Sequence, residues 1–458
     1  MKEFNFEKLP IVEIANEIII DAVNKGASDI HFDPSKDSLK IRFRIDGILS
    51  DYSIVPSKYK RNMISRIKMI AGMNIMETRL PQDGAIKSKI GDRLLDLRVS
   101  TLPTNNAEKI VIRILDYSMS LAGLDNLGFS KDAMEKINKL IRIPNGIILV
   151  TGATGTGKST TLYSILQKLN TEEVNIITVE DPVEMDIAGI NQVQTQTEIG
   201  LTFATILRSI LRQDPNIIMI GEIRDDETAR IAVRASITGH LVLSTLHTNN
   251  SLNTIERLTD MDVERYLLGS SLEGIISQRL ARKLCPNCMI KRQTTEYEKQ
   301  VFKTVIGKDI NEMYVANKEG CPRCNHGYRG RLAILEVLVM NEKIKDAITN
   351  NAPKHVLRDL VYTGEVVTLL QDGLNKVVEG ETSFEEILKI VDLENDMTAY
   401  KDDNLVANLK MAQKAHSIKE TPQQQPTPQV TQQVQQTIQP QAQQIKNQIQ
   451  SNVETVEF

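Results

Sequence analysis

The chain has 458 residues, a formal net charge of −4 and an aromatic content of only 4%, with no tryptophan. This length leaves room for two or three domains, whose cores aliphatic side chains must fill. The slightly acidic balance gives no general signal for nucleic-acid binding. No apolar run reaches the length that spans a membrane, and the opening MKEFNFEKLP does not resemble a signal peptide. We therefore expect a cytoplasmic protein that associates peripherally with the cytoplasmic membrane only through partners.

The first part of the chain, residues 1–118, has the pattern of a small α+β domain. Apolar residues recur at helical spacing from Ile11 to Ala22, and Gly26 follows as a helix end. Strand-like runs follow in LKIRFRIDGIL, LLDLRVSTL and KIVIRIL, and the helical stretch YKRNMISRIKMIAGM stands between the first two. Residues 119–129, with LAGLDNLGFS, are expected to form a linker.

The rest of the chain divides into two parts of different kind. Over residues 130–401, apolar strands alternate with helical patterns, which predicts a largely parallel sheet covered by helices. From residue 402 the chain becomes rich in Gln and Pro, as in TPQQQPTPQVTQQVQQTIQPQAQQ. Such a segment has too few apolar residues to offset the entropy of ordering. We predict a disordered tail over residues 402–458.

The stretch GATGTGKSTT directly follows the apolar run NGIILVT and has the spacing of a P-loop between a strand and a helix. Glycines allow successive N–H groups of such a turn to point at an anion, and the dipole of the following helix adds to the attraction. Lys158 is expected to reach the β- and γ-phosphates, and the Ser159 hydroxyl to bind Mg²⁺. The predicted nucleotide-binding residues are Gly152, Ala153, Thr154, Gly155, Thr156, Gly157, Lys158, Ser159 and Thr160.

A P-loop alone does not separate kinases, GTPases and motors, so the polar residues after the next strands must do so. The run NIITVEDPVE ends with Glu180 and Glu184, and NIIMIGEIRDDETAR ends its apolar part at Glu222. Strands of such a sheet bring the residues at their carboxyl ends to the ligand, where carboxylates can hold Mg²⁺ and orient water. A third strand, GHLVLSTLHTNN, is bracketed by His240 and His247. A pair of histidines around a strand beside a nucleotide site favours a functional role for them.

In combination, these segments resemble the secretion ATPase superfamily, the hexameric motors of type II secretion and type IV pilus systems. GATGTGKSTT, ITVEDPVE, LRQDPNIIMIGEIRD and TGHLVLSTLHTNN correspond to that family's Walker A, Asp box, Walker B and His box. GASDIHF, RFRIDG, RLPQDG and LRVSTLP match its second N-terminal domain. The resemblance covers roughly residues 5–395. It implies an α/β fold: a RecA-like P-loop NTPase motor domain with a smaller N-terminal α+β (PAS-like) domain.

The resemblance also implies roles for the polar residues. Glu184 matches the Asp-box glutamate that activates water, with Glu180 close by, and Glu222 matches the Walker B carboxylate near Mg²⁺. His240 and His247 match residues that sense or stabilise the γ-phosphate end. These roles make all five residues candidates for the catalytic machinery.

Four arginines are implied to reach the nucleotide, the first two of them from the N-terminal domain across an interface: Arg98, Arg113, Arg208 and Arg212. The planar fork of arginine suits the charge that develops on transferring phosphoryl oxygens. The sequence departs from the family at Asn216, where a second Asp is usual. Magnesium is assigned to Ser159 and Glu222; the departure removes one further carboxylate from the motif, and Asp214 is retained.

All four cysteines of the chain stand in two pairs, CPNC and CPRC. Each pair can hold one side of a tetrahedral metal, and four thiolates favour Zn²⁺. The pairs lie further apart than the roughly 15–20 residues usual for this pattern, so the segment between them has room for structure of its own. A cytoplasmic setting disfavours disulfides, and a redox CxxC needs a thioredoxin-like context that is missing. We predict a zinc subdomain over about residues 285–324, with Cys285, Cys288, Cys321 and Cys324 as ligands.

Taken with the resemblance, these features imply a homohexameric ATPase that hydrolyses ATP to ADP and phosphate with Mg²⁺ and also binds Zn²⁺. In the family the cysteine subdomain marks assembly motors, whereas retraction motors lack it. The expected partners are an inner-membrane platform protein and a cytoplasmic docking protein, and no nucleic acid. Many pilus-assembly ATPases carry a further N-terminal domain before the ASDIHF region, and here the chain begins almost at that region. We expect docking and regulation by that module to be missing or supplied by another protein.

Two other classes of function remain as alternatives. A nucleic-acid translocase or zinc-ribbon binder is suggested by the RecA-like pattern and by the locally basic CPRCNHGYRGR. A pI near 6.0 and the lack of basic stretches interleaved with aromatic residues argue against it. A non-hydrolysing assembly scaffold is disfavoured by the intact P-loop lysine and glutamates.

Overall fold

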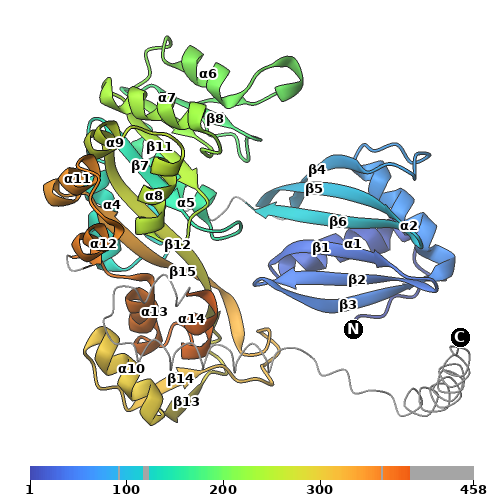
Figure 1. Cartoon of the computed structure of the whole chain (residues 1–458). Helices are drawn as coiled ribbons and strands as arrows, with labels where there is room; N and C mark the ends of the chain where they lie inside the picture. Colours follow the sequence, from blue (N-terminus) through green and yellow to red (C-terminus); the bar gives the residue numbers. More distant parts are fainter. Residues whose placement is uncertain (91–92, 117–122, 363–364, 392–458) are drawn as a thin grey trace, which may run out of the picture. The chain divides into compact units, whose positions relative to one another are not determined.

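The computed structural model describes residues 1–90, 93–116, 123–362 and 365–391. Within them, a six-stranded sheet organises the N-terminal segment (residues 1–116) and a seven-stranded sheet the C-terminal segment (residues 123–391), as Figure 1 shows. The predicted tail at residues 402–458 and the start of the predicted linker lie outside the described residues. The remainder of that linker contains the short 3₁₀ helix η1 (Leu124–Asn126).

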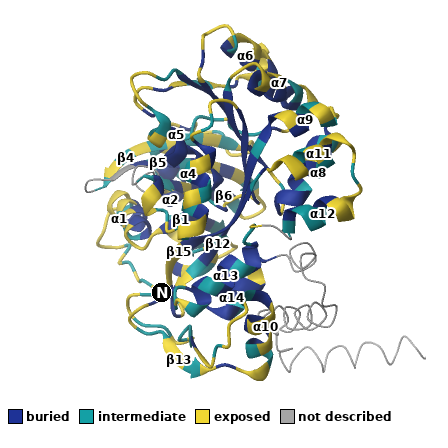
Figure 2. Ribbon diagram, turned by 90° about the vertical axis from the view of Figure 1, so that its left-hand side faces the viewer, coloured by how far each residue is buried: buried dark blue, intermediate teal, exposed yellow. Residues whose placement is uncertain are grey.

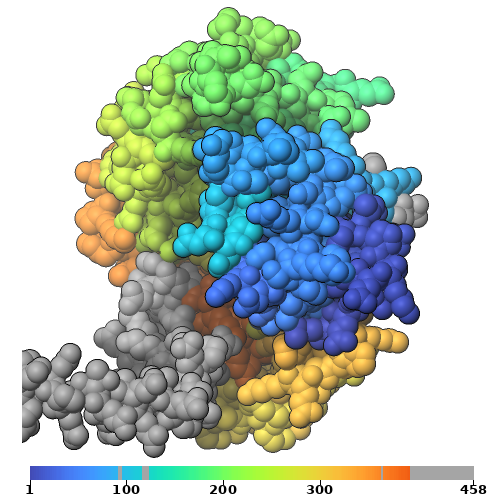
Figure 3. Space-filling view, turned by 90° about the vertical axis from the view of Figure 1, so that its right-hand side faces the viewer, coloured from blue at the N-terminus to red at the C-terminus, as the bar shows by residue number. Residues whose placement is uncertain are grey.

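The N-terminal segment packs two helices against an antiparallel sheet with strand order β3-β2-β1-β6-β5-β4. Ile14 and Ile18 of α1 pack in one apolar cluster with Phe32 and Phe43 of the sheet. In the space-filling view this segment forms one continuous body in blue and cyan (Figure 3). The helix expected from Ile11 onward is confirmed. The elements are α1 (Ile11–Asn24), β1 (Ala27–Pro34), β2 (Ser38–Ile45), β3 (Ile48–Pro56), α2 (Ser57–Ile70), β4 (Gln82–Ile90), β5 (Arg93–Thr104) and β6 (Ala107–Asp116).

The register of this sheet brings together two arginines that are distant in sequence. In the antiparallel pair β5–β6, Arg98 lies directly opposite Arg113, and in the pair β1–β6 Asp29 lies opposite Arg113. Directly opposed residues of neighbouring strands project from the same face of a sheet. Asp29, Arg113 and Arg98 therefore form a row across three strands.

The C-terminal segment has a seven-stranded sheet of order β15-β12-β7-β11-β10-β8-β9. All neighbouring strands pair in parallel except β12 and β15, which form an antiparallel pair. The expectation of a largely parallel sheet is thus confirmed. The strands are β7 (Gly146–Thr151), β8 (Ile176–Glu180), β9 (Asn191–Gln194), β10 (Ile217–Ile220), β11 (Leu241–Leu246), β12 (Leu272–Leu284) and β15 (Tyr328–Val339).

Helices cover both faces of this sheet because its central strands are apolar on both sides. Every residue of β7 is buried: Ile147 and Leu149 belong to one apolar cluster, and Ile148 and Val150 to another. Such runs are typical of strands in parallel sheets, and the sheet stands out as the dark, buried centre of Figure 2. One face packs on α4 (Lys131–Leu140) and α5 (Lys158–Leu169). The other packs on α6 (Phe203–Ile210), α7 (Asp226–Ile237), α8 (Ser251–Asp260), α9 (Arg265–Ser271), α11 (Glu342–Thr349) and α12 (Lys354–Tyr362).

The long strands β12 and β15 lead to the remaining elements. The segment between the two cysteine pairs forms β13 (Ile290–Gln293), α10 (Glu296–Ile306) and β14 (Glu312–Val315), and β13 pairs with β14. The expectation that this segment has structure of its own is confirmed. Helices α13 (Leu369–Val378) and α14 (Phe384–Ile390) pack beside β15 and β12 (Figure 1). No helix of the described residues is long and apolar enough to cross a membrane.

Candidate functional site

The P-loop connects β7 to α5 with the strand–loop–helix context that the sequence predicts. Gly152, Gly155 and Gly157 have φ angles of +147°, +80° and +87°, which residues other than glycine rarely adopt. A Cβ atom on Gly152 would also lie 2.5 Å from the carbonyl oxygen of Gln278. Both the backbone conformation and the space therefore require glycine at the start of the loop.

Lys158 lies inside the curve of this loop. Its Nζ donates hydrogen bonds to the carbonyl oxygens of Gly152, at 2.8 Å, and Ala153, at 3.0 Å. Burial lowers the pKa of Lys158, while the nearby charge of Glu222 acts in the opposite direction. A bound phosphate would supply the counter-charge that the loop's carbonyl groups do not. In contrast to the buried lysine, Ser159 at the start of α5 is exposed.

Glu180, at the end of β8, is held by three donors. Its Oε2 accepts a hydrogen bond from the Tyr163 hydroxyl, and its Oε1 accepts bonds from Thr178 Oγ1 at 2.6 Å and Gln192 Nε2 at 3.0 Å. The residue is only 3% exposed. Glu180 is thus a buried carboxylate whose three hydrogen bonds fix the positions of the neighbouring side chains.

Glu184 has very different partners. Its backbone N–H donates to the Tyr163 hydroxyl at 3.1 Å, and its Oε2 forms an ion pair with Arg98 Nη2 at 2.6 Å. Burial raises the pKa of the Glu184 carboxyl, Arg98 and Arg113 lower it, and Glu180 raises it further. A carboxylate with a raised pKa is a stronger base than an exposed one. The structure therefore brings three predicted residues together here: Glu184, Arg98 and Arg113.

Glu222 follows β10 at the same edge of the sheet. Its Oε1 accepts a hydrogen bond of 2.5 Å from Arg224 Nη2, and its Oε2 lies 3.3 Å from His247 Nε2. Arg224 holds the pKa of the Glu222 carboxyl below its usual range, with a smaller contribution from His247. The ends of β7, β8, β10 and β11 thus place the P-loop, Glu184, Glu222 and His247 along one edge, as parallel strands require.

His240 and Asn216 lie at the opposite edge. His240 precedes β11, its Nδ1 lies 2.8 Å from the Ala235 carbonyl oxygen, and a strand of this length spans roughly 20 Å between it and His247. Asn216 precedes β10, and its Oδ1 accepts the backbone N–H of Asn175 at 2.8 Å. The structure does not bring His240 to the P-loop of its own chain. Likewise, the change from Asp to Asn at position 216 removes no ligand from the edge that carries Glu222.

The other two predicted arginines lie on and just after α6. Arg208 pairs with Glu227 in the first turn of α7, and Arg212 Nη1 donates to the Arg208 carbonyl oxygen at 2.7 Å. Within the part of the chain that the structure describes, the hydrogen bonds and ion pairs of both arginines go to residues of α6 and α7.

Two residues that organise the site, Tyr163 and Gln278, belong to no recognisable motif of the sequence. Tyr163 carries a hydroxyl group on the buried face of α5, and Gln278 carries an amide within the buried first half of β12. The only sequence signal for either is a polar group in a run that must be buried, where it needs a hydrogen-bond partner. The hydrogen-bond partners of Tyr163 and Gln278 could not be identified without the fold.

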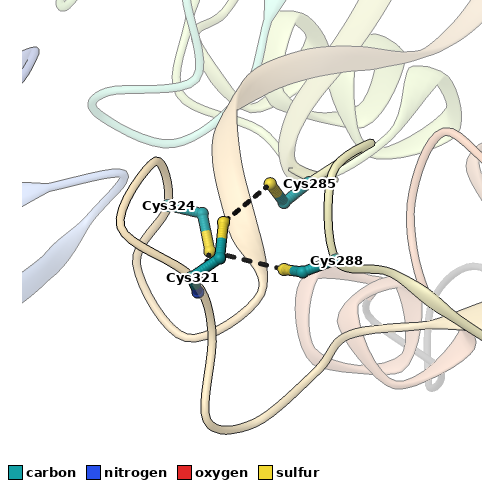
Figure 4. A group of neighbouring side chains, drawn as sticks. All are labelled: Cys285, Cys288, Cys321 and Cys324. Atoms are coloured by element: carbon teal, nitrogen blue, oxygen red, sulfur yellow. Dashed lines mark hydrogen bonds between the residues drawn. The ribbon is translucent and has the colours of Figure 1, made fainter.

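The four cysteines form a second candidate site, shown in Figure 4. Their sulfur atoms all lie within 4.8 Å of one another, with Cys285 to Cys321 at 3.8 Å and Cys288 to Cys324 at 3.6 Å. These separations are too long for disulfides, whose S–S length is about 2.05 Å. Sulfur ligands about 2.3 Å from a tetrahedral zinc ion stand about 3.8 Å apart. The arrangement of the free thiols therefore fits Zn²⁺.

The first cysteine is continuous with the main sheet. Cys285 follows the last residue of β12, and its backbone N–H donates to the Gly327 carbonyl oxygen at 2.8 Å. Leu284 pairs with Tyr328 at the start of β15. The β12–β15 ladder thus ends at the cysteine cluster.

Comparisons with known proteins agree with this architecture. A family model described as "Type II/IV secretion system protein" matches residues 5–389. The type II secretion system ATPase E of Vibrio cholerae is 44% identical over 382 residues, which are 83% of this chain and 75% of that protein. The type IV pilus assembly ATPase PilB of Myxococcus xanthus is 45% identical over 381 residues, 83% of this chain and 67% of that protein.

Solved structures show the same fold. The pilus retraction motor PilT with bound ADP has a TM-score of 0.56 and 26% identity, covering 87% of this chain and 98% of that one. The Legionella pneumophila ATPase DotB has a TM-score of 0.62 and 22% identity, covering 84% and 97%. Because the family model spans most of the sequence, the chain belongs to the type II/IV secretion system protein family.

Proposed function

We propose that this chain is a Mg²⁺-dependent ATPase that works as a homohexameric motor and powers pilin assembly in a type IV pilus or a related type II secretion or competence pseudopilus. The observation that carries the proposal is the edge of the sheet where the P-loop, Glu184, Glu222 and His247 meet. Relatives named as type II secretion ATPase E and as a pilus assembly ATPase support both the reaction class and the machine. The ATPase domain is assigned to residues 130–401 and the domain that supplies Arg98 and Arg113 to residues 1–118.

In the proposed reaction, water attacks the γ-phosphorus, ADP leaves, and the proton of the attacking water passes to Glu184. The half-buried carboxylate, whose pKa is raised by partial burial, suits that step because it accepts a proton more readily than a fully exposed glutamate. Lys158 and the N–H groups of the P-loop hold the phosphates. Arg98 and Arg113 supply positive charge where charge develops on the transferred group.

Magnesium, when bound, would neutralise phosphate charge. Its proposed ligands are Ser159 and Glu222, since hydroxyl and carboxylate oxygens are the donors that Mg²⁺ prefers. His247, next to Glu222, is proposed to sense the γ-phosphate. The hydrogen bond of Arg224 to Glu222 would have to open or share its acceptor when the ion binds.

The proposed motion between the two domains follows because the nucleotide contacts both of them. A nucleotide that touches both the P-loop and the N-terminal arginines favours the arrangement in which both sets reach it. Hydrolysis removes part of that preference and lets the two domains part. We propose that a membrane platform protein receives this motion. We further propose that zinc on the four cysteines stabilises the end of the β12–β15 ladder.

The test is hydrolysis by the purified full-length protein. Wild-type protein should release phosphate from ATP only when Mg²⁺ is present, and Lys158→Ala should neither bind nor hydrolyse ATP. Filter binding of labelled DNA and RNA at two salt concentrations tests the nucleic-acid alternative. Tight binding that weakens steeply with salt, together with hydrolysis that requires nucleic acid, would favour a translocase and overturn the proposal.

A further inference from the structure

Gln278 joins the P-loop to the helix that follows it. The side chain is 2% exposed and comes from β12, far from the P-loop in sequence. Its Nε2 donates a hydrogen bond of 2.8 Å to the carbonyl oxygen of Thr156, and its Oε1 accepts one of 2.8 Å from Thr161 Oγ1. One amide therefore contacts the loop before Lys158 and the helix after it.

The position of Gln278 is fixed by the strand that carries it. β12 pairs in parallel with β7, with Ser277 opposite Thr151, and the hydroxyl groups of these two residues lie 3.0 Å apart. Thr151 is the last residue before the P-loop, so Gln278 stands one residue beyond the pair, level with the loop. A Cβ on Gly157 would lie 2.8 Å from Gln278 Nε2, which shows how closely the amide packs against the loop.

Hydrogen bonds from Thr156 Oγ1 and Lys158 Nζ hold the carbonyl groups at the start of the loop, whereas the Thr156 carbonyl is held from outside the loop by Gln278. Glycine populates many backbone conformations, and three of the six residues from Gly152 to Gly157 are glycines. In a planar trans peptide, the carbonyl group and the following N–H point in opposite directions. Holding the Thr156 carbonyl toward Gln278 therefore directs the Gly157 N–H away from β12.

We infer that Gln278 is a positioning residue that sets the orientation of the Thr156–Gly157 peptide for phosphate binding, and that Thr161 holds the Gln278 amide in the orientation this requires. The inference rests on the nucleotide function proposed above. It concerns the diphosphate part that ATP and ADP share, so both nucleotides should depend on Gln278 equally.

Gln278→Met keeps the length of the side chain and removes both hydrogen bonds. The affinity for ATP and for ADP, measured by titration of a fluorescent analogue, should fall about tenfold, the order expected for a lost buried hydrogen bond. Thr161→Val should weaken binding less, because Gln278 Nε2 can still reach the Thr156 carbonyl. Thr161→Ser, which keeps the hydroxyl, should restore the wild-type affinity.

The double variant distinguishes positioning from general loss of packing. If Thr161 acts through Gln278, adding Thr161→Val to Gln278→Met should weaken nucleotide binding no further. The matched control is Thr382→Val, since Thr382 is also fully buried and donates its hydroxyl to a carbonyl of β12, that of Arg282, at 2.8 Å. That control should lower the melting temperature of the nucleotide-free protein without changing the nucleotide affinity.

Two results would overturn the inference: wild-type affinity in Gln278→Met, or an equal loss of affinity in Thr382→Val. If Gln278→Met does not fold, Thr161→Val and its rescue by Thr161→Ser decide the question alone. Failure of the wild-type protein to bind ATP would instead refute the proposed function, and wild-type and Lys158→Ala proteins measured in parallel reveal that case.

Discussion

The hydroxyl group of Tyr163 donates a hydrogen bond to the carboxylate of Glu180 and accepts one from the backbone N–H of Glu184. One phenol on α5 thus ties two neighbouring glutamates to the helix of the P-loop. Glu180 accepts further hydrogen bonds from Thr178 and Gln192 of the C-terminal segment. The Glu184 side chain instead forms its ion pair with Arg98 of the N-terminal segment. The two carboxylates are therefore assigned different tasks, one structural and one chemical.

Tyr163→Phe tests this division. It removes one donor from the buried Glu180 carboxylate and leaves the Glu184 N–H without its partner, which should cost about 1–3 kcal/mol of unfolding free energy. The turnover number should fall because Glu184 loses its anchor, while the affinity for ATP stays near the wild-type value. Denaturant unfolding and steady-state kinetics measure the two effects. A stable variant with unchanged turnover would show that Tyr163 does not position Glu184.

The pH dependence of turnover tests the surroundings of Glu184. Burial raises its pKa, so activity should fall on acidification at a higher pH than an exposed glutamate would give. Arg98 opposes this effect, and Arg98→Gln should therefore move the acidic limb of the kcat profile to still higher pH. Arg113→Gln should move it less, because Arg113 forms its ion pair with Asp29. If the acidic limb of the kcat profile lies at the same pH in Arg98→Gln as in the wild type, a group other than Glu184 controls that limb.

The four thiols predict a metal content that can be measured directly. Elemental analysis should find about one zinc ion per chain, since four thiolates complete a tetrahedral site. Cys321→Ser should lower both the zinc content and the melting temperature, because metal binding and local folding are coupled. Thr382→Val is the control: it should lower the melting temperature while the zinc content stays at the wild-type value. Fully active, stable protein without metal would exclude the structural role.

Much of the seven-stranded sheet could be predicted because its strands are short apolar runs that end in chemically distinctive residues. The P-loop, Glu222 and the cysteine pairs are each recognisable within a few residues of sequence. The row of Arg98, Arg113 and Asp29 depends instead on strand register, which no local pattern specifies. His240 stands in the same motif as His247, and only the direction of β11 shows that the two lie at opposite edges.

If the protein forms the proposed hexamer, rings made of two variants test whether the arginines act between subunits. Arg113→Ala and Lys158→Ala subunits lack different parts of the site, so mixed hexamers can rebuild complete sites if those parts come from different chains. Because Arg98, which lies opposite Arg113, contacts Glu184 of its own chain, we expect no recovery of ATP hydrolysis in rings whose mixed composition is verified by mass spectrometry. Recovery would instead assign Arg113 to the nucleotide of a neighbouring chain. Verified mixed rings without any recovery would assign the arginine to the nucleotide of its own chain or to no nucleotide. Rings of Arg113→Ala alone should bind ATP nearly as well as wild-type rings.

The central claim is that Glu184 activates the attacking water at an ATP site built on the P-loop. The most direct test is single-turnover hydrolysis of bound ATP by Glu184→Gln, with Glu180→Gln as the matched neighbouring variant. Glu184→Gln should bind Mg²⁺-ATP like the wild type and hydrolyse it roughly 10²-fold or more slowly, as expected for loss of a general base. Glu180→Gln should be less stable yet retain faster chemistry. Wild-type hydrolysis by Glu184→Gln, with an inactive but folded Glu180→Gln, would contradict the account and transfer the role to Glu180.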